Sequence, residues 1–306
     1  MNPFDAPDSP LNEPVTLLRI LAIVFPVLAI ALVGWAYGKR RGVEMGGANQ
    51  LNMDIFIPAL VFSALADKSF TLAGHWNLAL GAFLMAVGSG IIGRLLAPRV
   101  GIAPNALVIT MMFNNCGNLG LPLALLAFGP EGLPGAVVMF LVMNLLQFSF
   151  GIWLLDHHAR WWNFWRSPVI LAAAAGLAVS FSSFSLWPSL QLAIKMLGDV
   201  SIPLALFALG VRIAHSHVNH DLRVGVIGAL ARPAAGISLS WLLATLLGLQ
   251  GQEKAMLIIF GALPPAVINY VFAERYQQAP HQVAAIVLVG NIAAIVVVPL
   301  VLAAVL

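Results

Sequence analysis

Long apolar segments recur along almost the whole chain, and they constrain its fold more than any other feature. Ten segments approach the roughly 20 residues that a helix needs to cross a lipid bilayer. They are 17–38, 48–66, 76–97, 104–128, 134–155, 167–186, 189–211, 223–248, 252–273 and 282–305. Because hydrocarbon offers no hydrogen-bond partners, each segment must satisfy its own backbone, as a helix does. The pattern predicts an all-α membrane protein with ten transmembrane helices.

The composition supports this class and excludes several functions. Hydrophobic residues make up 60% of the chain and charged residues 9%, against about 25% charged in a soluble domain. The net charge of +3 is too small for a nucleic-acid surface, and the single cysteine, Cys116, excludes a multi-cysteine metal site. The histidines of 215–220 are expected to be polar loop residues rather than metal ligands. The sequence has no Walker motif and no nucleophile–base set, so we expect no ATP use, no cofactor and no enzymatic activity.

The basic residues indicate how the helices are oriented. Ten lysines and arginines, including those of 39–41, lie in one set of alternate loops, and three lie in the other set. Because positively charged loops stay in the cytoplasm, both termini are predicted to lie outside. Residues 1–16, with four prolines and three acids, are expected to form a flexible arm.

A repeated motif relates the two halves of the chain. DIFIPALVF at 54–62 and DVSIPLALF at 199–207 match at Asp, Ile, Pro and Phe with one offset of 145 residues. Five crossings separate the two expected helices, so they run in opposite directions, as in the inverted repeats of secondary transporters. We therefore expect a five-helix repeat at 17–155, a short cytoplasmic linker at 156–166 and a second repeat at 167–306.

Two of the apolar segments carry residues that break helices. NNCGNLGLP at 114–122 lies inside the fourth expected helix, and ALPPAVIN at 262–269 lies inside the ninth. Proline removes a backbone donor and glycine loosens the helix. Pro122 and Pro265 lie 143 residues apart, close to the repeat offset. Two helices broken at matching positions predict a binding site near the middle of the membrane, where half-helix N-termini would suit a carboxylate. The alternative is a pair of proline kinks capped by amides, with no ligand.

These residues carry a resemblance to the auxin efflux carrier family. ALPPAVINYVFAERYQQAP at 262–280 resembles the ninth-helix signature of that family, NLGLPL at 118–123 its fourth-helix crossover, and IPLALFALG at 202–210 its seventh helix. The resemblance implies that helices four and nine cross in an X. It also implies a scaffold of helices 1, 2, 6 and 7, a transport core of helices 3–5 and 8–10, and a homodimer in the plasma membrane that carries a small organic anion.

The chain also departs from the larger plant carriers of that family. Asn269 stands where those carriers have proline in the ninth helix, and a short linker replaces their long cytoplasmic loop. The resemblance is therefore to a bacterial-type member, which implies a malonate-like carboxylate or an auxin-like acid as the substrate.

The candidate substrate-binding residues come from the two breaks and from the fifth helix. The resemblance implies that a fifth-helix glutamine lines the substrate pocket, and Gln147 occupies that position, with Asn144 on the same helical face. The full candidate set is Asn114, Asn115, Asn118, Gly120, Pro122, Asn144, Gln147, Pro264, Pro265 and Asn269.

Four charged residues lie inside expected helices, where each costs about 2.5–3.5 kcal/mol on insertion scales. Asp54 and Asp199 occupy matching repeat positions, and Lys195 lies one turn before Asp199. One interpretation is that an aspartate titrates during transport or that Arg232 attracts the anion. The interpretation we favour is structural: Lys195 pairs with Asp199, and Arg232 bonds the carbonyls freed by Pro233. The breaks contain no acid, so neither sodium nor proton coupling is indicated.

Two functions are consistent with these features. The first is an alternating-access transporter of a small organic anion, with the anion bound where helices four and nine cross. The alternative is a membrane receptor or scaffold that binds an organic acid without transporting it.

Overall fold

The computed structural model describes residues 17–66, 72–156, 166–182, 186–215 and 222–306. The expected arm, most of the linker and nearly all of the histidine-rich loop lie outside the described residues. Every regular element in the described part is helical, with η1, η3 and η5 forming π-helical turns and η2 and η4 forming 3₁₀ turns. The elements are α1 (Leu17–Arg41), α2 (Gly46–Leu51), η1 (Asn52–Phe56), α3 (Ile57–Leu65), η2 (Leu72–His75), α4 (Trp76–Val100), α5 (Pro104–Met112), η3 (Cys116–Gly120), α6 (Leu121–Phe128), η4 (Pro130–Gly132), α7 (Leu133–Leu146), η5 (Gln147–Gly151), α8 (Ile152–Leu155), α9 (Pro168–Phe181), α10 (Pro188–His215), α11 (Leu222–Leu246), α12 (Gly251–Ala262), α13 (Ile268–Arg275) and α14 (Pro280–Val305).

Six helices in the described part are long and apolar enough to cross a membrane. They are Ile20–Arg41, Trp76–Val100, Pro130–Leu155, Pro188–Ala214, Leu222–Leu246 and Pro280–Val305. The prediction of an all-α, multi-pass membrane protein is confirmed. The number of ten membrane helices is not confirmed and stays a prediction.

Within the described residues, none of the four other expected helices forms a single long, uninterrupted apolar helix. Segment 48–66 is helical from α2 through α3, but its first half carries polar residues such as Asp54. Segment 167–186 forms α9, which has 14 residues. Segments 104–128 and 252–273 are each interrupted by non-helical backbone.

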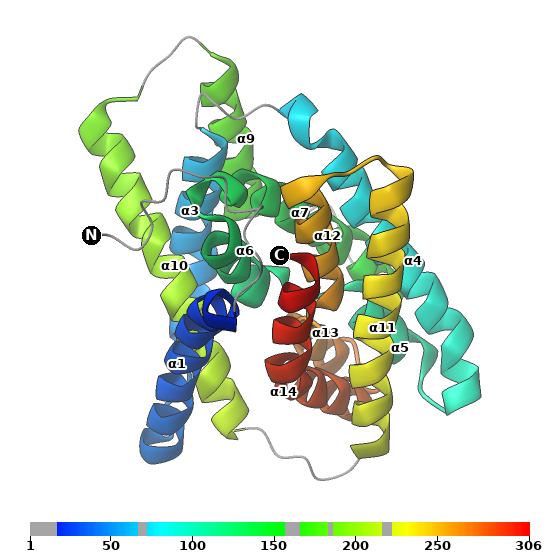
Figure 1. The fold of residues 1–306 in the computed structure, drawn as a ribbon. Helices are drawn as coiled ribbons and strands as arrows, with labels where there is room; N and C mark the ends of the chain where they lie inside the picture. Colours follow the sequence, from blue (N-terminus) through cyan, green and yellow to red (C-terminus); the bar gives the residue numbers. More distant parts are fainter. Residues whose placement is uncertain (1–16, 67–71, 157–165, 183–185, 216–221) are drawn as a thin grey trace.

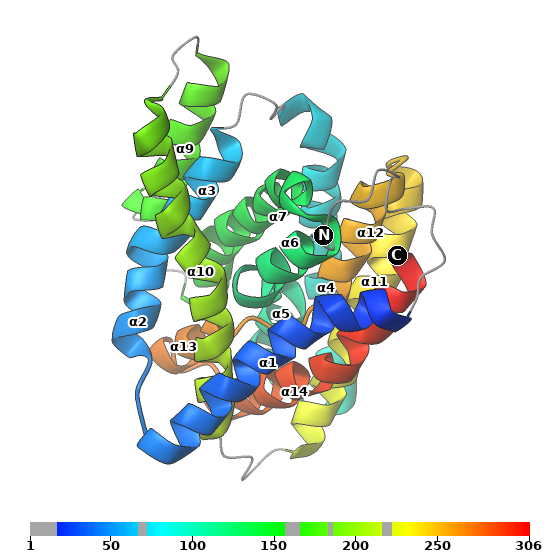
Figure 2. The same ribbon diagram turned by 60° about the vertical axis from the view of Figure 1, so that its left-hand side comes forward.

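The helices pack chiefly within two groups. In the first group α1 packs along α10, and α3 packs against α9 and α10. In the second group α11 packs against α4, α12 and α14, and α4 packs against α5 and α7. Figures 1 and 2 show α3, α9 and α10 on one side of the molecule and α4, α11 and α12 on the other, with α6 and α7 between them.

Glycines on the facing sides of α1 and α10 allow these two helices of the first group to approach closely. A side chain at Gly34 of α1 would collide with the backbone of Phe207, and one at Gly210 of α10 would collide with the backbone of Ala31. Small residues allow membrane helices to approach closely and gain dispersion contacts. The α1–α10 contact therefore depends on both positions staying small.

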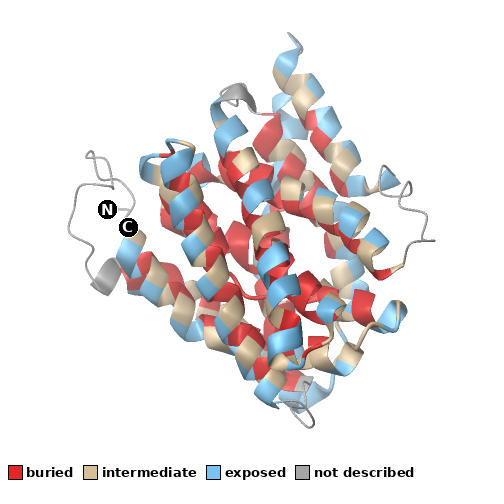
Figure 3. Cartoon of the chain, turned by 90° about the vertical axis from the view of Figure 1, so that its right-hand side faces the viewer, coloured by how far each residue is buried: buried red, intermediate tan, exposed pale blue. Residues whose placement is uncertain are grey.

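Burial follows this packing. Figure 3 shows buried residues where helices face one another and exposed residues on the outer faces. Large apolar side chains such as Phe25, Leu230 and Leu246 point outward on these faces. Such extended apolar surface is typical of protein that contacts lipid rather than water.

Candidate functional site

The first interruption divides the fourth apolar segment. α5 ends at Met112, Phe113 is extended, and the helix resumes at Cys116 as the π-turn η3, which continues into α6. Pro122 has no N–H, and its ring would clash with the carbonyl four residues earlier. This clash favours the wider π-turn that precedes it.

The second interruption divides the ninth apolar segment. α12 ends at Ala262 and α13 begins at Ile268. Leu263 has φ −60° and ψ 143°, because the ring of Pro264 disfavours the α conformation in the residue before it. Pro264 and Pro265 also supply no N–H with which the helix could continue.

The two interruptions lie against each other and share backbone hydrogen bonds. The N–H of Asn115 donates to the carbonyl of Pro264 at 2.8 Å, and the N–H of Ala266 donates to the carbonyl of Phe113 at 2.9 Å. Asn114 and Pro265 form an antiparallel bridge at the same place. Each segment thus replaces helical bonds that it has lost with bonds to the other, as buried irregular backbone in a membrane requires.

Side-chain amides satisfy the carbonyls at the helix ends. Asn114 Nδ2 donates to the carbonyl of Phe260 in α12 at 2.6 Å, and Asn269 Nδ2 donates to that of Phe113 at 2.9 Å. Gln147 Nε2, from η5, donates to Asn269 Oδ1 at 2.8 Å. The last carbonyls of a helix lack an intrahelical α-helical donor, and these buried amides add a second donor to the carbonyls of Phe113 and Phe260, which also accept from the N–H groups of Ala266 and Leu263.

Asn291 of α14 joins the same network. Its Oδ1 accepts a hydrogen bond from Asn115 Nδ2 at 3.1 Å, and its Nδ2 donates to the carbonyls of Pro265 at 3.1 Å and Val287 at 2.8 Å. Sequence reasoning missed this residue. The signal that could have found it is an asparagine inside an otherwise apolar segment, since polar groups within membrane helices are rare and usually functional.

Arg232 of α11 is buried beside the end of α12. Its side chain is 1% exposed, and its Nη1 donates to the carbonyl of Gly261 at 3.1 Å. Its Nε and Nη2 have no hydrogen-bond partner, and no acidic side chain pairs with it within the described residues. The guanidinium offsets the partial negative charge of the α12 C-terminus. The carbonyl that it binds belongs to α12, not to its own helix before Pro233 as the sequence suggested.

Glycines bring three helices together around this end of α12. A side chain on Gly261 would collide with Ser240 and with the backbone of Gly236 in α11. A side chain on Gly120 of η3 would lie 2.9 Å from Leu263 Cδ1. Both glycines therefore allow a close approach, the first to backbone and the second to a movable side chain.

Gly120 and Pro122 lie inside helical turns rather than in the break, as Asn118 of η3 and Asn269 of α13 also do. Gly120 belongs to η3 and Pro122 to the first turn of α6, so the first interruption is shorter than the expected 114–122. Pro265, by contrast, lies in non-helical backbone. Pro122 and Pro265 are therefore not at equivalent positions, although their separation of 143 residues is close to the offset of 145 residues in the repeated motif.

Two other candidates lie apart from the amide network. The side chain of Asn118 is half-buried and makes no hydrogen bond within the described residues. Asn144 is buried, and its Nδ2 donates to the carbonyl of Phe140 in its own helix at 2.8 Å. Sharing a helical face with Gln147 does not bring Asn144 to the partners of Gln147.

The matching aspartates of the repeat lie on the outer surface. Lys195 and Asp199 form an ion pair of 2.7 Å with side chains that are 62% and 57% exposed. Gln50 donates to Asp54 at 2.6 Å, also on the exposed surface. None of these groups contacts the amide network. In the part of the chain that is described, no three His, Cys, Asp or Glu side chains are grouped to hold a metal ion.

A small cavity lies at the boundary between the two helix groups. It has a volume of about 60 Å³ and is enclosed by α1 and α10 on one side and by η3, α6 and α14 on the other. Among the described residues its lining is apolar except for Asn291. The amide network therefore reaches the surface where the two helix groups meet.

Helices that are broken at membrane depth and paired with one another inside the protein are typical of secondary transporters. The fold and the site thus define the class as a multi-pass membrane transporter. The chain belongs to the membrane transport protein family, the family of the auxin efflux carriers, whose sequence profile matches residues 19–160 and 157–302.

Similar proteins occur in archaea and plants. An uncharacterized transporter of Methanocaldococcus jannaschii is 24% identical over 279 residues, which cover 83% of this chain and 89% of that protein. An uncharacterized transporter of Methanothermobacter thermautotrophicus is 25% identical over 296 residues, which cover 90% and 95%. Auxin efflux carrier component 6 of Arabidopsis thaliana is 27% identical over 173 residues, which cover 54% of this chain and 28% of the plant protein.

Proposed function

We propose that this protein moves a small organic anion across the plasma membrane by alternating access. The substrate binds where the two interrupted segments cross. The observation that carries the proposal is the joined pair of interruptions beside Arg232, a buried cation that has no acidic partner among the described residues.

The charge at this place favours an anionic substrate. The helical run Cys116–Phe128 and helix α13 both begin at the crossing, and helix N-termini carry partial positive charge and unpaired N–H groups. Arg232 adds a full positive charge. A buried cation with no partner is strongly unfavourable, and a bound carboxylate would balance it during part of the transport cycle.

The proposed architecture is two inverted five-helix repeats with ten membrane crossings. The α1–α3, α9 and α10 group would be the scaffold, and α4–α8 with α11–α14 would be the transport core. The packing of α1 on α10 and of α11 on α4, α12 and α14 supports this division. The cavity of about 60 Å³ between the groups is smaller than the roughly 300 Å³ of a typical ligand pocket, so a substrate enters when the core moves against the scaffold.

The proposed orientation places both termini outside the cell. The proposed assembly is a homodimer, supported by the exposed Lys195–Asp199 pair of α10. Charges within a membrane helix are expensive when they face lipid, and a second copy of the chain would cover them. Substrate candidates are a malonate-like carboxylate, or an auxin-like acid as the name of the plant relative suggests.

Counterflow in proteoliposomes tests the proposal. Vesicles are loaded with unlabelled malonate, another carboxylate or indole acetate, and uptake of the labelled anion is followed while pH, sodium and voltage are varied separately. A transporter accumulates label transiently, whereas a receptor binds anion without exchanging it. Binding without counterflow for every anion would overturn the proposal in favour of the receptor.

Substitutions at the crossing test whether the substrate binds there. Asn115→Ala and Asn269→Ala are expected to lower counterflow while folded protein remains in the membrane. Asn77→Ala is the matched control, because Asn77 donates to Leu247 on the exposed surface of α4. Normal counterflow in both crossing variants would contradict this location.

Arg232→Gln removes the positive charge and keeps a polar side chain at this position. We expect counterflow to fall by at least about tenfold, equivalent to 1.4 kcal/mol. The melting temperature should stay the same or rise, since removing a buried charge is often neutral or stabilising. Unchanged counterflow would show that the charge does not serve the anion.

A further inference from the structure

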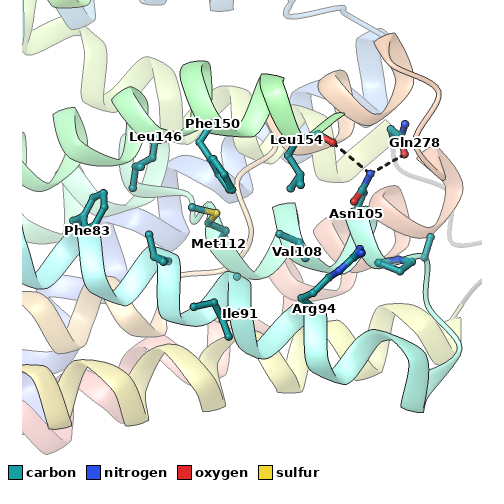
Figure 4. A pocket seen from close by; sticks show the side chains of 14 residues that line it. Phe83, Ile91, Arg94, Asn105, Val108, Met112, Leu146, Phe150, Leu154 and Gln278 are labelled. Atoms are coloured by element: carbon teal, nitrogen blue, oxygen red, sulfur yellow. Dashed lines mark hydrogen bonds between the residues drawn. The ribbon is translucent and has the colours of Figure 1, made fainter. Parts of the chain in front are cut away.

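A second, larger cavity lies away from the amide network. It has a volume of about 850 Å³ and runs between α4, α5 and the η5–α8 end of the fifth segment. Figure 4 shows its body lined by apolar side chains. The main contributors are Phe83, Val87, Ile91, Val108, Leu146 and Phe150. This cavity is a groove along the outer side of the second helix group.

The groove opens toward lipid. Phe83, Ile91 and Phe150 line it and are 42%, 56% and 40% exposed. They belong to Trp76–Val100 and Pro130–Leu155, two of the helices long and apolar enough to span a membrane. Water in the apolar part of the groove would lack hydrogen-bond partners, so this part suits hydrocarbon better than water.

One end of the groove is polar. Asn105 Nδ2 donates to Gln278 Oε1 at 3.2 Å and to the carbonyl of Leu154 at 3.5 Å, as Figure 4 shows. Gln278 Nε2 donates in turn to the carbonyl of Leu155 at 3.2 Å. The two amides thus hold the α13–α14 turn against the end of the fifth segment and close the groove at this end.

Arg94 supplies the charge at this polar end. It lines the groove and is exposed, and its side chain makes no hydrogen bond or ion pair within the described residues. None of the described residues that line the groove is acidic. Arg94 lies six residues before the end of α4, or about 9 Å along the helix axis. From that depth a long arginine side chain reaches the headgroup level.

We propose that this groove binds one acyl chain of an anionic phospholipid, with the headgroup held by Arg94. The apolar body takes the chain, and the unpaired guanidinium selects a negative headgroup over a neutral one. The lipid comes from the cytoplasmic leaflet, where the basic loops are expected to lie. Met112, the last residue of α5, also lines the groove, so the bound chain packs against the helix that leads into the first interruption.

Native mass spectrometry of the purified full-length protein tests this proposal. The probes are phosphatidylglycerol and phosphatidylcholine with the same acyl chains, added in equal amounts. We expect the wild-type protein to retain phosphatidylglycerol in preference. Arg94→Gln should reduce that preference by about fivefold, since one arginine near the surface contributes about 1 kcal/mol toward anionic lipid. Arg99→Gln is the matched control, because Arg99 lies on the same helix and does not line the groove.

Filling the groove tests the acyl-chain part separately. Val87→Trp should lower retention of both lipids, whereas Leu95→Trp, an exposed position of α4 outside the groove, should not. If Val87→Trp does not fold, Ile91→Trp fills the groove from its exposed edge. Equal lipid retention by Arg94→Gln and Arg99→Gln would overturn the proposal. Displacement of the lipid by added malonate or indole acetate would also overturn it, because the groove would then serve the substrate.

Discussion

The two interruptions differ in how they satisfy their backbone. The first contains Asn114 and Asn115, and both side chains donate hydrogen bonds to groups outside the interruption. The second, LPPAV at 263–267, contains no polar side chain. Its carbonyls accept from Asn115 of the first interruption and from Asn291 of the last helix. The first interruption thus carries its own amides, and the second takes its partners from elsewhere.

This difference shows that two interruptions can pair with each other without having the same side-chain chemistry. After the first interruption the chain resumes through a π-turn, and after the second it resumes as α13. Because donors of one interruption satisfy acceptors of the other, each interruption does not need its own complete set of hydrogen-bond partners. Substitutions on the two sides should therefore have unequal effects.

The largest expected difference in unfolding free energy is between alanine substitutions of two glycines, one next to each interruption. Gly261→Ala should lower the free energy of unfolding by about 3 kcal/mol, whereas Gly120→Ala should lower it by about 1 kcal/mol. The added methyl at Gly261 meets the backbone of Gly236, which cannot move easily, whereas at Gly120 it meets side chains of Leu263 and Phe260. Thermal unfolding in detergent measures both. Gly47→Ala is the control, since nothing lies within 4 Å of that position, and equal losses at Gly261 and Gly120 would contradict the comparison.

Asn269→Leu should have the next largest effect on the free energy of unfolding. It removes a donor from the Phe113 carbonyl and leaves Gln147 Nε2 buried without its acceptor. The expected loss is about 2 kcal/mol of unfolding free energy. Asn118→Leu serves as control and should change stability by less than about 0.5 kcal/mol. Similar melting temperatures for the two variants would show that the Asn269 bonds contribute little.

The bond between the two halves can be measured directly. In a double-mutant cycle, Asn115→Ala and Asn291→Ala should show a coupling energy of about 1 kcal/mol, because their side chains are hydrogen-bonded to each other. The same cycle with Asn118→Ala and Asn291→Ala should give a coupling near zero. A coupling near zero in both cycles would mean that the second interruption does not depend on this bond.

Asn144→Leu should have the smallest effect. Its side chain donates to the carbonyl of Phe140 in the same helix, and such a local bond adds little to a carbonyl that the helix already pairs. The expected change in unfolding free energy is less than about 0.5 kcal/mol. A loss as large as that of Asn269→Leu would show that Asn144 has a partner outside its own helix.

Much of the fold follows from residue patterns along the chain. The apolar segments predict an all-α membrane protein because hydrocarbon leaves the backbone few alternatives. The motif at 262–280 identifies the family, and Pro264 with Pro265 marks the second interruption within a few residues, because two adjacent prolines cannot continue a helix.

The first interruption was harder to locate from sequence. Gly120 and Pro122 look like breakers, but the helical run Cys116–Phe128 continues through both residues, because the π-turn η3 accommodates Pro122. The break falls at 113–115, where Asn114 and Asn115 bond to the other half instead of to their own segment. That outcome depends on a partner far along the chain, which local propensity does not encode. Asn291 was missed for the same reason.

The bridge between Asn114 and Pro265 has a consequence for biosynthesis. The two residues lie about 150 positions apart, so at about 5–20 residues per second a ribosome needs roughly 8–30 s to make the second after the first. During that interval the Phe113 carbonyl has neither of its final donors, Ala266 and Asn269. Because an unpaired carbonyl is costly in hydrocarbon, another donor must satisfy it until α12 and α13 have been made.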